Sequence, residues 1–186
     1  MGFIGFVLIG VLVVLAIALI GIYNRLVGLR QNVRQGAADI DAQLRQRHDL
    51  VPNLVETVKG YASHESETLN AVIQARNAAA KGHPDSGSEQ GFKVALDNLL
   101  ALSEAYPDLK ANTNFQELQR ELADIEDKLA AARRALNAAV SRYNTARESF
   151  PVVMFAGAFG FQEADFNKLD DSERGSVDQV PQVGFN

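Results

Sequence analysis

Cysteine is absent from the 186-residue sequence, and this absence excludes several kinds of chemistry. Without a thiol the chain can form no disulfide, no thiolate metal site, no cysteine nucleophile and no lipid attachment through cysteine. Basic residues are also in the minority, because 18 Lys and Arg stand against 23 Asp and Glu, a formal charge of −5. A general nucleic-acid binder needs a dominant basic surface, so we expect no nucleic-acid partner.

The residue patterns typical of enzymes are missing as well. His64-Glu65 begins like a metalloprotease helix, but Thr68 stands where the second histidine is needed. His48, His64 and His83 fall on different predicted elements without a carboxylate at ligand spacing, so we expect them to be exposed or at helix ends. The sequence also has no nucleophile elbow and no phosphate-binding glycine loop. We therefore expect no catalytic residue, no metal site and no cofactor.

Charge is absent from the 21 residues between Phe3 and Tyr23. A helix of this length rises about 31 Å, close to the roughly 30 Å thickness of a bilayer's hydrocarbon core. No Lys or Arg precedes the run and no small-residue cleavage site follows it, which favours a membrane anchor over a cleaved signal peptide. We assign residues 1–24 to this anchor.

Three arginines, Arg25, Arg30 and Arg34, follow the anchor closely. An excess of basic residues after a span predicts that the chain beyond it is cytoplasmic and that the N-terminus lies outside. The same arginines either set this topology alone or also bind anionic lipid headgroups.

Proline and glycine are absent from the interior of the segment 112–150, where apolar and alanine positions recur every three or four residues. This spacing predicts one long helix with a single coiled-coil-like seam, capped by Asn112 or Thr113. A similar seam over residues 26–61 starts directly after the anchor and includes Arg47. It predicts one continuous helix with a kink or a one-turn break at Pro52.

Two shorter helices are predicted over Ser63–Lys81 and Glu89–Tyr106, and no segment has the alternation of a strand. The expected fold is therefore all-α. The transmembrane helix continues into an elongated antiparallel up-and-down four-helix bundle over residues 25–150, with long first and last helices. The remainder, 151–186, is an aromatic segment followed by an acidic tail that we expect to be disordered.

Several motifs resemble the LemA family of bacterial single-pass membrane proteins. The resemblance covers most of residues 20–160 and is carried by Val51-Pro52-Asn53-Leu54-Val55-Glu56-Thr57-Val58-Lys59-Gly60-Tyr61-Ala62, Tyr23-Asn24-Arg25-Leu26-Val27, Ala111-Asn112-Thr113-Asn114-Phe115, Arg142-Tyr143-Asn144 and Ser149-Phe150-Pro151. It implies an anchor in the bacterial inner membrane and a cytoplasmic helical bundle without enzymatic activity or cofactor. Two positions depart from the family pattern: a large aromatic is usual near Ala37-Ala38, and a tyrosine is usual where this chain has His48.

Helix lengths predict self-association. The two long helices reach about 57 Å and the two short ones only about 27–29 Å, so the short pair covers only the half away from the membrane. The membrane-proximal half is then expected to be two helices alone, which cannot bury a seam well in water. Small residues there allow close packing between copies in a lateral, cyclic homo-oligomer. The predicted interface residues are Gly36, Ala37, Ala38, Ala131, Ala135, Ala138 and Ala139.

The aromatic segment after Pro151 is expected to end near the bilayer, because the last helix of an up-and-down bundle returns toward the membrane. Phe155, Phe159, Phe161 and Phe166 can then dock at the membrane interface or on a neighbouring subunit. The alternative is a tail folded over its own bundle.

Together these patterns favour a non-enzymatic membrane scaffold or adaptor that self-assembles. Its expected partners are membrane lipids, further copies of the chain and other membrane proteins. A ligand-sensing or signalling bundle is the alternative, and it would need a buried pocket lined by residues such as Glu56, Lys59 and Tyr61. A membrane-bound hydrolase is a third hypothesis, supported only by His64-Glu65.

Overall fold

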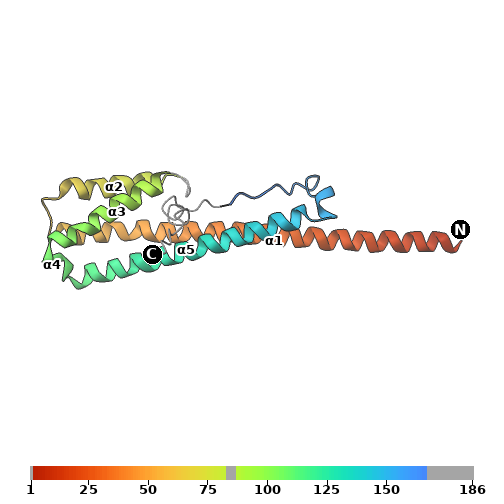
Figure 1. Cartoon of the computed structure of the whole chain (residues 1–186), viewed down its shortest axis with the longest axis horizontal. Helices are drawn as coiled ribbons and strands as arrows, with labels where there is room; N and C mark the ends of the chain where they lie inside the picture. The colour runs from red at the N-terminus through yellow and green to blue at the C-terminus, as the bar shows by residue number, and fades with distance from the viewer. Residues whose placement is uncertain (1, 83–86, 167–186) are drawn as a thin grey trace, which may run out of the picture.

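The structure is a computed structural model that describes residues 2–82 and 87–166. Within these ranges all regular secondary structure is helical, which confirms the all-α class (Figure 1). The elements are α1 (Phe3–Lys59), α2 (Ser66–Ala79), α3 (Gly87–Ala105), α4 (Pro107–Lys110), α5 (Thr113–Glu148) and the 3₁₀ helix η1 (Val152–Met154). The acidic tail 167–186 and His83 lie outside the described residues.

Helix α1 is a single element of 57 residues that joins the uncharged run to the domain. The predicted one-turn break at Pro52 is not present, because the helix continues through this residue to Lys59. The other predicted boundaries hold within a few residues, except that α2 starts at Ser66 without a side-chain cap from Ser63. The short helix α4 was not predicted.

The N-terminal cap of α5 is Asn112, one of the two residues that the sequence offered for this role. The side-chain oxygen of Asn112 accepts a hydrogen bond from the backbone N–H of Phe115 at 2.9 Å. Such a cap satisfies one of the N–H groups that a helix start leaves unpaired, and contributes about 1 kcal/mol.

The long helices α1 and α5 lie antiparallel along each other, and α2 and α3 form a hairpin beside the end of α1 that is far from the N-terminus (Figure 1). Helix α1 packs chiefly on α5, and α2 chiefly on α3. The short hairpin thus covers only part of the long pair, as the helix lengths predict. The full up-and-down four-helix arrangement stays a prediction.

One hydrophobic core joins the four longer helices at this end. Each contributes a side chain with no exposed surface, and these are Leu54 of α1, Val72 of α2, Leu99 of α3 and Ile125 of α5. Burying a side chain of this size contributes about 1.5–3 kcal/mol. The core therefore fixes the hairpin on the long pair.

A second, smaller core lies between α1, α5 and the segment that follows α5. Its buried members are Leu26, Tyr143, Ala156 and Phe161. The expectation that the proximal half consists of two helices alone is therefore wrong. Apolar side chains of the segment after Pro151 are removed from water when they pack against the flank of the helix pair, which favours this arrangement.

The first part of α1 extends beyond the rest of the molecule (Figure 1). An 18-residue window there has a mean hydropathy of 3.2, and none of it is buried by the rest of the chain. By length and composition α1 is long and apolar enough to cross a membrane, so its N-terminal part is a candidate membrane span.

Candidate functional site

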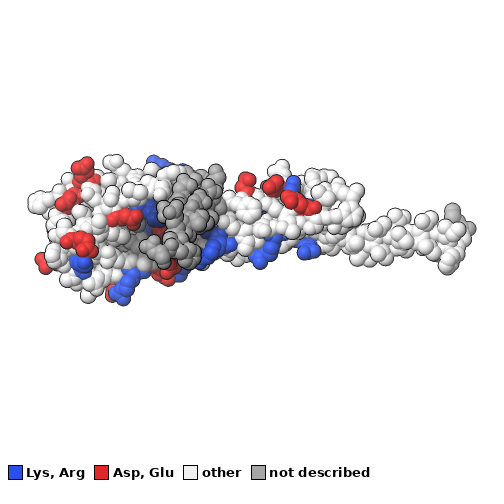
Figure 2. All heavy atoms as spheres, in the orientation of Figure 1, with Lys and Arg blue, Asp and Glu red and all other residues white. Residues whose placement is uncertain are grey.

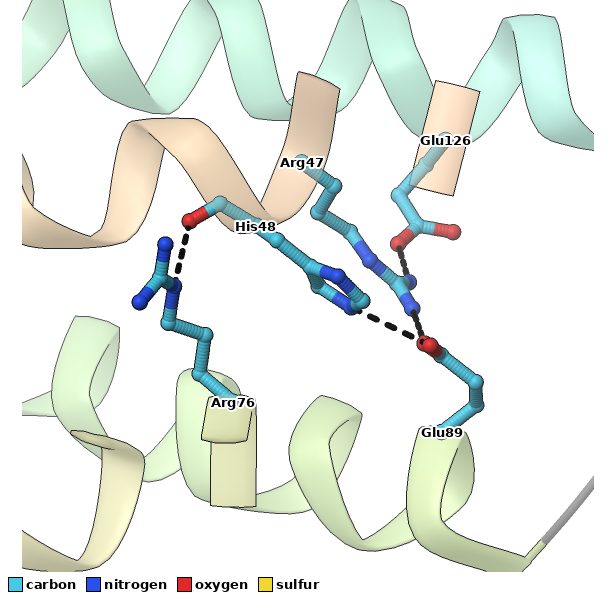
Figure 3. A network of polar contacts seen from close by, with 5 residues as sticks. All are labelled: Arg47, His48, Arg76, Glu89 and Glu126. Carbon is cyan, nitrogen blue, oxygen red and sulfur yellow. Dashed lines mark hydrogen bonds and ion pairs between the residues drawn. The ribbon is translucent and has the colours of Figure 1, made fainter. Parts of the chain in front are cut away.

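A buried arginine connects three helices in the core (Figure 3). Arg47 of α1 is only 3% exposed, and its guanidinium donates from Nη1 to Glu126 of α5 and from Nη2 to Glu89 of α3, each at 2.5 Å. Its Cζ also lies 5.2 Å from the ring centre of Phe92. One buried cation thus has two carboxylate partners and an aromatic face, which offset the cost of removing it from water.

His48 lies next to this ion pair and is buried, so its expected place at an exposed or terminal position was wrong. Its Nε2 is 3.1 Å from Oε1 of Glu89, and its ring meets Phe92 edge to face at 5.0 Å. Burial by itself raises the pKa of Glu89. The contact with His48 and the positive charge of Arg47 outweigh this effect and hold that pKa below its ordinary value of 4.5.

The hairpin is also attached to the backbone of α1. Nε of Arg76, on α2, donates a hydrogen bond to the carbonyl oxygen of His48 at 2.9 Å. In an α-helix that carbonyl would accept the N–H four residues later, but position 52 is proline and has no N–H. Pro52 thus leaves the carbonyl oxygen of His48 without a helical donor, and Arg76 donates to it instead.

The network of Arg47, His48, Arg76, Glu89 and Glu126 consists of contacts within the chain. Arg47 pairs with Glu89 and Glu126, whereas Arg76 donates to a backbone carbonyl. In the described part of the chain no group of three or more His, Asp or Glu could hold a metal ion. These contacts connect α1 with α2, α3 and α5.

The His64-Glu65 pair is divided between two environments. His64 is exposed, whereas Oε1 of Glu65 accepts a hydrogen bond from the hydroxyl of Tyr106 at 2.9 Å. This hydrogen bond, with smaller effects from burial and from the carboxylate's charge, raises the pKa of Tyr106. Glu65 therefore links the start of α2 to the residue between α3 and α4.

The residues proposed to line a ligand pocket lie at the surface. Glu56, Lys59 and Tyr61 are all exposed. The hydroxyl of Tyr61 accepts a hydrogen bond from the side-chain amide of Asn112 at 2.9 Å, which connects the ends of α1 and α5. This placement gives no support to a buried sensing pocket at these residues.

Side chains of α5 form hydrogen bonds with the backbone of residues 161–164, in the segment that follows this helix. Asn144 donates from its amide to the carbonyl of Ala164 at 2.9 Å and accepts from the N–H of the same residue at 3.0 Å. The Tyr143 hydroxyl donates to the carbonyl of Gln162 at 2.7 Å, and Nε of Arg147 donates to that of Phe161 at 3.1 Å. We call Tyr143, Asn144 and Arg147 the tail clamp.

The four phenylalanines predicted to dock have different surroundings. Phe161 is buried on its own chain, 5.4 Å from the ring of Tyr23 and 5.0 Å from Cζ of Arg30. Phe159 is exposed but also touches Tyr23, at 5.7 Å between ring centres. Phe155 is half-buried and Phe166 is exposed. The position of Phe161 therefore agrees with the alternative prediction, in which the tail folds over its own bundle.

Comparison with known proteins identifies the family. The sequence model of the LemA family matches residues 36–185, well over half of the chain. This chain belongs to the LemA family. The resemblance recognised in the sequence motifs is confirmed.

Relatives are found in several bacteria. Magnetosome protein MamQ of Magnetospirillum gryphiswaldense is 23% identical over 173 residues, and magnetosome protein MamQ 2 of Paramagnetospirillum magneticum is 25% identical over 173 residues. Each alignment covers 77% of this chain, which spans 64% of the relative's length. Protein LemA of Metamycoplasma hominis is 24% identical over 163 residues, covering 86% of this chain and 74% of the relative. None of these names denotes a reaction.

The predicted headgroup arginines of this LemA-family chain do not share one environment. Arg25 and Arg34 are exposed, whereas Arg30 is half-buried beneath Phe161 and its Nε is shielded from solvent. Arg25 and Arg34 are thus the better placed to reach lipid headgroups.

The predicted interface residues are also divided. A Cβ added at Gly36 would lie 3.2 Å from the Cα of Leu136, so Gly36 is the point where α1 and α5 approach closely. Ala139 is buried within the chain. The remaining five are exposed, namely Ala37, Ala38, Ala131, Ala135 and Ala138.

The polar network and the tail clamp were not recognised from sequence. Their signals were present, because Arg47 falls on the apolar seam of the first long helix and Tyr143 on that of the last. A charged residue at a seam position is expected to be buried and therefore paired, but the sequence does not indicate which residues are its partners. The family motif Arg142-Tyr143-Asn144 also marked the clamp without indicating its use.

Proposed function

We propose that this LemA-family protein is a non-enzymatic, membrane-anchored scaffold or adaptor that assembles laterally through its helical domain. The observation that carries the proposal is α1, one unbroken helix. Its first part is apolar and is not buried by the rest of the chain, and its last part contributes to the domain core. Its 35 residues from Arg25 to Lys59 rise about 52 Å, so an anchored chain projects the hairpin well away from the membrane.

The buried polar network and the names of the relatives support the same role. The network around Arg47 ties helices together and pairs Arg47 with Glu89 and Glu126. The relatives are named for a magnetosome and for the family itself, and not for a reaction. These points favour a protein that positions other components over one that converts a substrate.

We place the anchor in the bacterial inner membrane, with the N-terminus outside and the helical domain in the cytoplasm. Arg25 and Arg34 support this orientation, because both are exposed within the stretch that follows the uncharged run. The chain has no cysteine, so a single cysteine at Gly2 or at Ser63 can be labelled without interference. In intact cells a membrane-impermeant maleimide should label the Gly2→Cys variant and not Ser63→Cys. The reverse pattern would overturn this topology.

The exposed alanines are the proposed contacts between copies. Close approach of small residues favours lateral packing, and anchors in one membrane raise the effective concentration of neighbours. Ala139→Glu is a poor test because Ala139 is buried in its own chain. Ala135→Glu changes an exposed position instead, and Ala123→Glu is a matched control on the distal part of the same helix.

The decisive measurement is the mass of the detergent-solubilised protein by light scattering. We expect a defined homo-oligomer for the unmodified chain and for Ala123→Glu, and a smaller species for Ala135→Glu with unchanged helix content. A monomer before any substitution, or an oligomer that survives Ala135→Glu, would contradict lateral assembly through these alanines.

A further inference from the structure

The aromatic segment, taken together with the preceding Phe150, runs to Phe161 and carries apolar side chains on its outside. Phe150 is 81% exposed and Met154 is 74% exposed, and Val153 and Phe159 are also exposed. No charged residue occurs between Ser149 and Gln162. A contiguous uncharged stretch with several exposed large apolar side chains marks an interaction surface.

The aromatic segment is held at a fixed place on the chain. Its inner side packs through Ala156 and Phe161 into the smaller core, and the tail clamp binds the backbone that follows. Phe159 and Phe161 both contact Tyr23, the last residue of the uncharged run. The exposed side chains are therefore attached to a rigid pair of helices and do not form a loose tail.

This place coincides with the level where the candidate membrane span ends. In Figure 1 the segment lies beside α1 where the bare apolar helix emerges from the domain. Figure 2 shows only white surface directly beside the bare apolar helix in the view drawn, whereas Lys, Arg, Asp and Glu begin a short way behind it and continue over the rest of the body. Tyrosine is typical of the membrane–water interface, which sets the level of Tyr23.

We infer that the aromatic segment is a second membrane contact, inserting Phe150, Met154 and Phe159 into the interfacial layer of the leaflet that α1 leaves at Tyr23. The inference rests on the proposed anchoring by α1 and adds a partner to it, the lipid surface of the same membrane. A lone span can tilt and rotate within the bilayer. A second contact on a fixed arm restricts both motions and sets the direction in which the domain projects.

The chain contains no tryptophan, so a single introduced one reports on its own surroundings. Phe150→Trp and Met154→Trp place the probe on the aromatic segment. Leu12→Trp places it within the apolar run, and Val94→Trp at an exposed position of α3, far from the anchor. Each full-length variant is reconstituted in vesicles of phosphatidylcholine and phosphatidylglycerol with lipids brominated near the headgroup or near the middle of the acyl chain.

Bromine quenches tryptophan fluorescence only on close contact. We expect Phe150→Trp and Met154→Trp to lose more fluorescence with shallow than with deep bromine, Leu12→Trp to show the opposite order, and Val94→Trp to remain unquenched. If Leu12→Trp is unquenched, the proposed anchoring itself fails. If Leu12→Trp is quenched and both segment probes are not, only the second contact is overturned.

A second copy of the chain is the competing occupant of the aromatic segment. In that case the segment probes would have blue-shifted emission without bromine quenching, and the shift would fall as the protein is diluted in lipid. That result would also overturn the lipid contact. The two segment probes are independent, so a folding defect in one leaves the other to decide.

Discussion

Arg76 donates a hydrogen bond to the backbone carbonyl of His48 at 2.9 Å, at the one place where Pro52 leaves that carbonyl without its helical partner. A proline in a helix interior removes a hydrogen bond and normally costs about 3 kcal/mol. Here the open carbonyl becomes the acceptor for an arginine from α2. The proline thus creates a docking point for the hairpin within an unbroken α1.

This relationship predicts coupling between Pro52 and Arg76. Arg76→Ala should destabilise the protein by about 1–3 kcal/mol, because the His48 carbonyl is left without a donor. In a Pro52→Ala background the same change should cost less, since an alanine at this position supplies a backbone N–H to that carbonyl. Urea unfolding of the unmodified chain, the two single variants and the double variant in detergent measures the coupling. An equal cost of Arg76→Ala in both backgrounds would refute the account.

The buried ion pair predicts a larger and non-additive effect. Arg47→Met leaves Glu89 buried without its cation, and Glu89→Met leaves Arg47 with only one carboxylate. Removing one partner of a buried pair costs about 3–5 kcal/mol, whereas replacing both by apolar residues is often near neutral. The double variant should therefore be more stable than the sum of the single losses predicts. Simple additivity in denaturant unfolding would show that the two side chains act independently.

Acid should weaken the same network. The pKa of Glu89 in the folded chain lies below its ordinary value of 4.5, so the unfolded chain binds this proton more readily. The stabilisation is fully present above about pH 4.5 and is lost as the pH falls through the lowered folded pKa. Glu89→Gln should flatten the fall of unfolding free energy on the acid side of pH 4.5. Glu121→Gln, at an exposed position, is the control and should leave the slope unchanged.

The long helices were predictable because their apolar periodicity is regular and their ends carry clear signals. Asn112 caps α5 as its side chain and position suggest, and the seam that starts at Leu26 predicts a helix continuous with the anchor. Periodicity identifies a buried face but not the distant segment that covers it. The partners of Arg47 lie on α3 and α5, 42 and 79 residues away, and no local pattern indicates them.

The packing of the aromatic segment was hidden for a related reason. Its phenylalanines and glycines follow no helical or strand period, so the sequence cannot distinguish Phe161, which is buried, from Phe159, which is exposed. The position of each phenylalanine depends on hydrogen bonds between the tail clamp and the backbone of the tail. Every residue has these backbone groups, so the tail sequence does not indicate which of them are bound.

The tail clamp predicts a local effect of Asn144. Asn144→Ala removes both hydrogen bonds to the backbone of Ala164, so the segment 161–166 should open without unfolding the main core. Hydrogen exchange should accelerate at Ala164 and its neighbours while Val72 and Leu99 keep their protection. Asn98→Ala, at an exposed position of α3, is the matched control. Unchanged exchange at Ala164 would show that the clamp does not hold the segment.

The close contact between α1 and α5 predicts responses of different size from two glycines of α1. At Gly28 an added Cβ meets nothing within 4 Å, so Gly28→Ala should stabilise the helix by up to about 1 kcal/mol through helix propensity. At Gly36 the added Cβ would meet the Cα of Leu136 at 3.2 Å and its Cβ at 3.3 Å. A neighbouring backbone atom cannot turn away as the end of a side chain can, so Gly36→Ala should gain less than Gly28→Ala.

Gly36→Val extends the same test, because its two methyl groups must enter a space that the Leu136 backbone already limits. Forcing extra carbons into a packed contact costs about 1–3 kcal/mol. The helices would have to separate at this level, and the loss should appear in denaturant unfolding measured in detergent. Gly28→Val carries the same β-branched side chain at an open position. The difference in unfolding free energy between the two valine variants therefore excludes the intrinsic helix propensity of valine. If the two valine variants prove equally stable, then α1 and α5 do not approach each other at Gly36 as closely as the structure indicates.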